Sequence, residues 1–162
     1  NIIEINLLHA GVKKVKQSDL RDQPHSGYRA LHLHIFSDAG RAELQIRTPL
    51  QAQWANLYEV AADIYGRDIR YLELGATVSP QAAKEVNELH QLSTLVADLE
   101  RAEDAVTRPF SGGRQSSPEE FGAGLRALKH RVYDILTATE KRLRGARETN
   151  TSKGAGYSCL HS

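Results

Sequence analysis

Cysteine occurs only once in the 162 residues, at Cys159, and methionine does not occur at all. A single cysteine excludes an internal disulfide and is typical of a reducing compartment, so we expect a cytoplasmic protein. No apolar run approaches the roughly 20 residues that a membrane-spanning helix needs, and no signal peptide is recognisable. The sequence therefore predicts a protein with no membrane partner.

An excess of one charge is also lacking. The 21 Lys and Arg residues nearly balance the 20 Asp and Glu residues, which gives a formal net charge of +1 and excludes a global electrostatic drive toward nucleic acid. A hydrophobic content of 40% and a charged content of 25% are ordinary for one compact domain. Because residue 1 is Asn, the sequence is consistent with a segment of a longer protein and equally with the loss of an initiator methionine alone.

Two alternating segments predict a β-hairpin. Polar and apolar side chains alternate over residues 28–36 and again over 41–48, which is the period of a strand. The residues between them, Ser-Asp-Ala-Gly at 37–40, are typical of a tight turn. Upstream, 1–17 reads as a strand or the end of a helix, and 18–27 reads as a loop.

Three helices are expected after the hairpin. Thr48 is a predicted N-cap for a helix over 49–65, with Pro49 at its first position. A second helix begins at Pro80, and a third begins at a capping box that starts at Ser117. Each helix carries one apolar stripe, so the last two are expected to pair as a helical hairpin that serves as scaffold or as a homo-oligomer interface.

The order of these elements predicts an α+β fold. We assign residues 1–78 to an α/β core, 79–148 to a C-terminal helical region and 149–162 to a tail.

A row of polar groups lies on one face of the second predicted strand. Glu43, Gln45 and Arg47 occupy alternate positions, so their side chains are spaced about 6.6–7 Å apart along a groove. A carboxylate can hold a hard cation such as Mg²⁺, a guanidinium can clamp phosphate oxygens, and an amide can orient a hydroxyl. The row suits a phosphorylated ligand, and a solvated strand face is the alternative.

The first predicted strand carries further candidates. Tyr28 follows Gly27, whose backbone freedom lets a ligand approach, and the tyrosine ring could stack on a nucleobase. A lone histidine is usually structural, but His32 has Tyr28 and Arg29 beside it in the sequence. His34 falls on the same face without comparable support for a function.

Three short motifs carry a family resemblance. The segments GYRALH (27–32), AELQIRT (42–48) and WAN (54–56) occur in this order and at short spacing. Together they resemble the alarmone synthetase family of the RelA/SpoT type, over about residues 18–72. The order of motifs looks most like that of the compact single-domain members, several of which act as toxins.

The resemblance implies a fold and a reaction. The fold would be nucleotidyltransferase-like, with a mixed β-sheet flanked by helices. The activity would be that of a GTP pyrophosphokinase, which moves the β,γ-diphosphate of ATP to the ribose 3′-hydroxyl of GDP or GTP with Mg²⁺ as cofactor.

The resemblance also implies residue roles. Tyr28 would stack on the acceptor base, and His32 would contact acceptor phosphate. Glu43 would hold Mg²⁺ and assist removal of the hydroxyl proton. The predicted catalytic residues are Glu43, Gln45 and Arg47, and the predicted substrate-binding residues are Tyr28, Arg29, His32 and Asn56.

Several family features are replaced or missing. Pro24 stands where the family usually has Lys, Ala52 stands where a guanine-reading Asn is frequent, and Tyr58-Glu59 replaces a frequent Glu-His pair. The sequence contains neither an Arg-x-Lys-Ser stretch for ATP phosphates nor an Asp-x-x-Gly that would supply a second metal carboxylate. The three replacements concern the acceptor side, and the two missing motifs concern the ATP side.

Two alternative functions follow from the departures. The first is a toxin-type member that pyrophosphorylates tRNA 3′ ends, with Arg67, Arg70 and the cations of 141–147 against RNA and with an antitoxin partner. The second is a catalytically incomplete nucleotide-binding module. A further feature is that residues 153–161 repeat the pattern Gly-Tyr-x-x-Leu-His, as a chance match in a tail or as a second acceptor loop.

Overall fold

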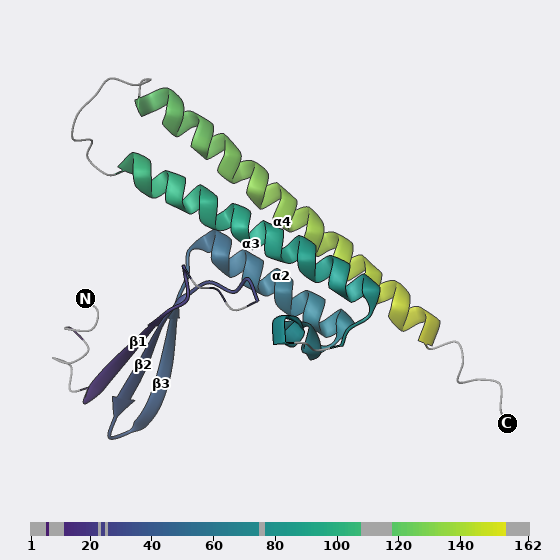
Figure 1. The fold of residues 1–162 in the computed structure, drawn as a ribbon, viewed down its shortest axis with the longest axis horizontal. Coiled ribbons are helices and arrows are strands. Elements are labelled where there is room, and N and C mark those ends of the chain that lie inside the picture. The colour runs from purple at the N-terminus through teal and green to yellow at the C-terminus, as the bar shows by residue number, and fades with distance from the viewer. Residues whose placement is uncertain are drawn as a thin grey trace.

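In the part of the chain that the computed structural model describes, three strands are followed by three long α-helices, with a 3₁₀ helix between the first and the second. The structure describes residue 6, residues 12–22, residue 24 and residues 26–74, 77–107 and 118–154. Figure 1 shows α3 and α4 as a long antiparallel pair, α2 packed beside them, and the sheet extending away from the N-terminal end of α2. The elements are β1 (Lys14–Asp19), β2 (Leu31–Ser37), β3 (Gly40–Ile46), α2 (Pro49–Tyr65), η1 (Arg67–Leu74), α3 (Pro80–Thr107) and α4 (Pro118–Gly154).

The sheet has the order β1-β2-β3, and both strand pairs are antiparallel. The predicted hairpin is confirmed, because β2 and β3 pair from Leu31 opposite Ile46 to Ser37 opposite Gly40. Part of the predicted loop over 18–27 is wrong, since β1 continues to Asp19. An α+β fold is therefore observed. All described strand pairs are antiparallel, and the mixed sheet stays a prediction.

The predicted start of α2 is confirmed by its capping geometry. The Thr48 hydroxyl oxygen accepts a hydrogen bond from the Gln51 backbone N–H at 3.1 Å, and the Gln51 side chain accepts one from the Thr48 N–H at 3.2 Å. This reciprocal pair satisfies two donors that a helix start leaves unpaired. The helix ends at Tyr65, and Gly66 follows with a φ of 92°, a conformation that favours glycine.

The other helices begin where the Ser-Pro signals predicted, at Pro80 and Pro118. The capping box expected from Ser117 lies outside the described side chains. The helix α4 extends to Gly154 and so enters the segment predicted as a tail. The repeat at 153–161 falls outside the described residues after Gly154. The 3₁₀ helix η1 was not predicted.

One hydrophobic core is shared by all the helical elements. Its buried members come from α2, η1, α3 and α4, with Leu57 and Ala61 of α2 fully buried. The boundary predicted between 78 and 79 therefore separates two segments of chain that pack on the same core. None of the described helices has both the length and the apolar character needed to cross a membrane.

The apolar face of the sheet is less well covered. Leu33 of the central strand β2 is buried, but Leu44 of β3 is 43% exposed. The alternation of β3 predicts that Leu44 faces the core together with Ile46, and this prediction is wrong for Leu44. The physical reason is its place in the sheet, because β3 is an edge strand with a neighbouring strand on one side only.

Polar contacts join the sheet to the helices. The Ser26 hydroxyl donates to the Arg70 carbonyl at 2.7 Å, and the Ser93 hydroxyl donates to the Gly27 carbonyl. Gly27 has a φ of 79°, and a Cβ added there would lie 2.9 Å from Cζ2 of Trp54. Glycine is thus required by the packing of Trp54 against the backbone, whereas the sequence had been interpreted as leaving room for a ligand.

Candidate functional site

A pocket of about 490 Å³ lies where the sheet meets α2 and η1. Its helical wall includes Trp54 and Tyr58 of α2 and Arg70 of η1. Five of the seven predicted site residues line it, namely Tyr28, His32, Gln45, Arg47 and Asn56. Segments that are separate in the sequence thus supply a single concave surface with several polar groups, which is the usual form of a small-molecule site.

The predicted polar row on β3 is held by its own hydrogen bonds. The Gln45 amide nitrogen donates to Glu43 Oε1 at 2.8 Å, and the Arg47 guanidinium donates to Gln45 Oε1 at 2.7 Å. Because a guanidinium only donates and a carboxylate only accepts, these two neighbours determine the orientation of the Gln45 amide. The three groups form a row from the pocket wall to its rim.

Tyr28 and His32 bond to this row from the neighbouring segment. The Tyr28 hydroxyl donates to Gln45 Oε1 at 3.0 Å, and the same hydroxyl lies 3.0 Å from His32 Nε2. The Arg47 guanidinium carbon lies 5.4 Å from the centroid of the Tyr28 ring, within the range of a cation–π contact. Burial raises the pKa of Tyr28, and the opposing positive charge of Arg47 only partly offsets this effect, so the ring keeps its hydroxyl proton.

These contacts orient the ring of His32. The Tyr28 hydroxyl lies 3.0 Å from Nε2, and Nδ1 is the ring nitrogen on the side of Glu43.

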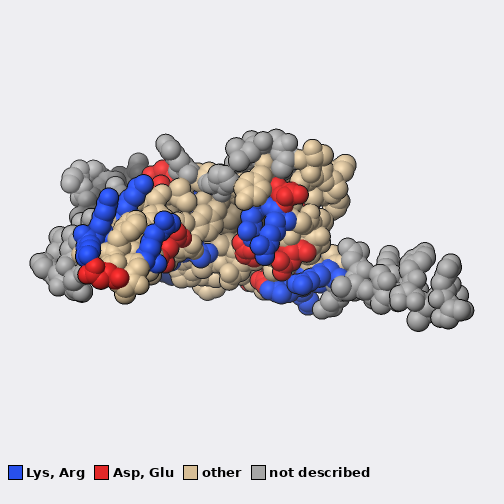
Figure 2. Space-filling model, turned by 90° about the horizontal axis from the view of Figure 1, so that it is seen from below, with Lys and Arg blue, Asp and Glu red and all other residues tan. Residues whose placement is uncertain are grey.

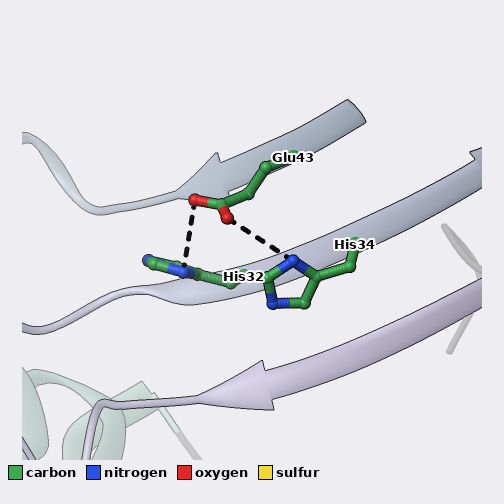
Figure 3. Close-up of side chains that lie close together, drawn as sticks. All are labelled: His32, His34 and Glu43. Atoms are coloured by element: carbon green, nitrogen blue, oxygen red, sulfur yellow. Dashed lines mark ion pairs between the residues drawn. The ribbon is translucent and has the colours of Figure 1, made fainter. Parts of the chain in front are cut away.

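Glu43 faces two histidines rather than open solvent alone. Figure 3 shows the Glu43 carboxylate directed toward His32 and His34, with Nδ1 of His32 3.5 Å from Oε1 and Nδ1 of His34 3.4 Å from Oε2. Hydrogen bonding from Gln45 lowers the pKa of Glu43, and the charges of His32, His34 and Arg41 lower it further. The carboxylate is therefore ionised at neutral pH, beside the imidazole rings.

Arg29 lies apart from this group. Its Nε donates to the Ser93 hydroxyl at 3.2 Å, and its guanidinium also donates to the Arg21 carbonyl. It does not line the pocket, so the structure places it at the junction between the sheet and α3. Asn56 is exposed on α2 and does line the pocket.

Other pocket residues were not predicted as site residues. Glu59 and Arg70 line the wall and form an ion pair. Glu59 had been noted only as a departure from a family Glu-His pair, and Arg70 only as an RNA contact in the tRNA alternative. Tyr58 lines the pocket and donates its hydroxyl to the Ile69 carbonyl at 3.0 Å. His34 was set aside, although its position two residues from His32 on an alternating strand was the signal that could have identified it.

The charges around the site are mixed in sign. Figure 2 shows Lys and Arg side chains over the sheet and over the helical part, with acidic side chains among them. Lys13 pairs with Asp38, and Arg147 lies 3.4 Å from Asp63. The face drawn there is therefore not a continuous positive surface of the kind that binds a nucleic-acid backbone nonspecifically.

Comparisons with known proteins add relatives but not an activity. The chain is 46% identical over 154 residues to the uncharacterized protein Mb1401 of Mycobacterium bovis and to the uncharacterized protein Rv1366 of Mycobacterium tuberculosis. The alignments cover 91% of this chain and 54% of each relative, so the chain spans about half the length of these relatives. No family model matches, and no solved structure matches.

Proposed function

We propose that the pocket binds a purine nucleotide and that the chain is the acceptor side of a pyrophosphokinase of the RelA/SpoT type. The observation that carries the proposal is the convergence of Tyr28, His32, Gln45, Arg47 and Asn56 on one pocket, with Glu43 joined to the same row. The three family-like motifs supplied these residues from sequence alone. A nucleotidyltransferase-like fold with a mixed sheet is part of the proposal.

The pocket offers a suitable surface for each part of a nucleotide. Tyr28 presents an aromatic ring to a base, with Arg47 over the ring at 5.4 Å from its centroid. Arg47 and His32 offer positive charge or N–H donors to phosphate oxygens. Asn56, exposed on α2, can reach a hydroxyl or a base edge.

The reaction that fits these groups is diphosphate transfer. The 3′-hydroxyl oxygen of the acceptor attacks the β-phosphorus of ATP, the bond to the α,β-bridging oxygen breaks, and AMP leaves with that oxygen. The hydroxyl proton passes to a base, and Glu43 is the group we assign to it because its carboxylate is ionised at neutral pH. Positioning and charge neutralisation provide most of the rate in such transfers.

Mg²⁺ is the cofactor that this reaction implies. The Glu43 carboxylate is a ligand that Mg²⁺ takes, and magnesium sites commonly combine one or two carboxylates with phosphate oxygens and water. Bound there, the ion would neutralise charge on the transferred group.

Nucleotide binding can be measured directly on this chain. Trp54 is the sole tryptophan of the sequence and lines the pocket, so its fluorescence should change when GDP, GTP, ADP or ATP binds. Tyr28→Ala should weaken acceptor binding by about 1–3 kcal/mol if a base stacks there. Tyr71→Ala is the matched control, because Tyr71 is 52% exposed and outside the pocket. Equal effects of the two substitutions would refute the stacking role.

Transfer is tested with radiolabelled ATP and each acceptor, in this chain and in the longer relatives. Glu43→Gln should abolish transfer by orders of magnitude and should change stability by less than about 0.5 kcal/mol. Glu140→Gln, on α4 and outside the residues that line the pocket, should leave the rate unchanged. A Glu43→Gln enzyme that keeps most of its activity would contradict the assignment of β3 as the catalytic edge.

Two alternatives give other outcomes in the same experiments. A toxin-type member would transfer to the 3′ end of tRNA rather than to GDP or GTP, with an RNA affinity that falls steeply with salt. Arg70 forms an ion pair with Glu59. This pairing argues against Arg70 as a contact for RNA phosphate in the tRNA alternative. A nucleotide-binding module would bind a purine nucleotide without turnover in either the chain or its longer relatives.

A further inference from the structure

The cluster of His32, His34 and Glu43 contains two nitrogen donors in addition to the carboxylate. One potential ligand atom from each residue lies within 4.8 Å of the others. Magnesium selects oxygen ligands, whereas imidazole nitrogen suits zinc and its first-row neighbours. The donor set therefore differs from the one that the proposed function requires.

We infer that His32, His34 and Glu43 bind a divalent transition-metal ion of the zinc class. This inference goes beyond the proposed function, because diphosphate transfer does not require a cation of this class. The inferred site does not depend on a bound nucleotide. Two imidazoles and a carboxylate with one open position are a known arrangement for Zn²⁺.

The donor atoms of the cluster lie near enough to share one ion. Nδ1 of His32 is 3.5 Å from Oε1 of Glu43, and Nδ1 of His34 is 3.4 Å from Oε2. One potential ligand atom from each residue lies within 4.8 Å of the others, whereas bonds of 2.0–2.1 Å place neighbouring ligands of a tetrahedral zinc about 3.3 Å apart. Rotation of the imidazole rings and the carboxylate can close the remaining separation.

The orientation of the side chains provides a second argument. Tyr28 lies 3.0 Å from Nε2 of His32, and Nδ1 of the same ring faces the Glu43 carboxylate at 3.5 Å. Nδ1 of His34 faces the other carboxylate oxygen at 3.4 Å. All three side chains thus direct a potential ligand atom toward the same space.

The surroundings of His32 favour the metal. Histidines that bind metals usually donate their second ring N–H to a neighbouring group, which orients the ring and determines its tautomer. Tyr28 performs this role for Nε2 of His32 at 3.0 Å, and Gln45 orients the Glu43 carboxylate at 2.8 Å. Tyr28 and Gln45 are thus positioning residues for the metal ligands.

The location gives the ion access to the pocket. His32 lines the pocket, and its side chain is 14% exposed, whereas that of Glu43 is 38% exposed. An ion can therefore enter from solvent on the Glu43 side. Its open position can take water or an oxygen atom of a molecule in the pocket.

The test uses the 162-residue chain without a histidine tag, freed of metal with EDTA and then dialysed. Zn²⁺ is titrated calorimetrically, and Co²⁺ is titrated by visible absorption as a spectroscopic probe of tetrahedral geometry. We expect one ion per chain, not displaced by a roughly thousandfold excess of Mg²⁺. Absence of stoichiometric binding, or displacement by an equal concentration of Mg²⁺, would overturn the inference.

Variants assign the ion to this cluster. His34→Gln should weaken Zn²⁺ binding at least about tenfold, and His130→Gln, an exposed histidine on α4, should not change it. Tyr28→Phe should weaken binding about tenfold, because it removes the hydroxyl that contacts both Nε2 of His32 and Gln45 while keeping the ring. If His34→Gln does not fold by circular dichroism, Glu43→Gln replaces it. Unchanged binding in the folded ligand variants would refute the site.

The two proposals can fail separately. Zn²⁺ is titrated without any nucleotide. Binding of the acceptor nucleotide, without ATP, is measured by Trp54 fluorescence in the presence of EDTA. A chain that binds Zn²⁺ but no nucleotide would refute the proposed function and support the metal site. A chain that binds a nucleotide but no Zn²⁺ would support nucleotide binding and refute the metal site.

Discussion

The helices and the sheet are stabilised by different means. Buried apolar side chains of α2, η1, α3 and α4 form one continuous core. The segment that leads into β2 is hydrogen-bonded to the helices through Ser26, Gly27 and Arg29. The helices therefore supply stability, and the sheet supplies the polar groups of the site. The difference indicates that substitutions of polar side chains on the sheet should have little effect on the free energy of unfolding.

The largest expected effect comes from a matched pair of leucines. Leu57 is fully buried on α2, and Leu44 is 43% exposed on β3. Leu57→Ala should lower the free energy of unfolding by about 2–5 kcal/mol because it leaves a cavity. Leu44→Ala should lower it by less than about 1 kcal/mol. Urea denaturation measures the free energy of unfolding of both variants. Similar losses would contradict the claim that the helical core contributes more stability than the sheet.

Gly27→Ala tests the junction between the two regions. The positive φ of 79° and the 2.9 Å approach of an added Cβ to Trp54 both oppose a side chain there. We expect a loss of about 2–4 kcal/mol from the strained backbone and the overpacking together. Gly40→Ala is the control, because that position is positive in φ but has nothing within 4 Å of the added Cβ. Thermal unfolding of both variants separates strain from overpacking.

Arg142→Ala tests a polar contact within the helical part. Its guanidinium donates to both oxygens of Glu85, at 2.6 and 2.8 Å, and Glu85 is only 3% exposed. Removing the arginine leaves a buried carboxylate with fewer donors, so we expect a loss of about 1–3 kcal/mol. Arg101→Ala breaks an ion pair whose two side chains are exposed and should cost less than about 1 kcal/mol. Equal losses in urea denaturation would contradict the role of burial.

The smallest expected effect is the pH dependence of an ion pair at the end of β1. Hydrogen bonding from Arg21 lowers the pKa of Asp19 below its ordinary value of 3.8. A lowered folded-state pKa stabilises the protein above the unfolded-state pKa, and this contribution is lost as the pH falls through the folded-state value. Because the pair is largely exposed, Asp19→Asn should cost less than about 1 kcal/mol at pH 7. Unfolding measured at pH 7 and pH 3 should show the variant and the parent converging at the lower pH.

Much of the local structure could be predicted from the sequence. Thr48, Pro49 and Gly66 predicted the bounds of α2, because helix caps and stops depend on residues adjacent in the chain. Alternation predicted the hairpin and the shared face of Glu43 and Gln45 for the same reason. The 3₁₀ helix η1 was missed, since its residues carry no comparable start signal.

The candidate site could be predicted only in part. Tyr28, His32 and the β3 row were identified, because strand periodicity places alternate residues on one face. Arg29 was expected beside them but instead bonds to Ser93, which is 64 positions away in the chain. No local pattern contains that contact, since it depends on how α3 packs against the loop before β2.

By itself, the sequence determined the β2–β3 hairpin, the starts of the three long helices and which strand side chains share a face, because each of these depends on neighbours within a few residues. Only the tertiary structure decided that His34 and Glu43 lie opposite each other across β2 and β3, that Leu44 is exposed on an edge strand, and that Arg70 closes the pocket. These outcomes depend on strand register and on packing between distant segments. A long-range contact forms only after the chain has closed a loop, so its partners cannot be read from adjacent residues.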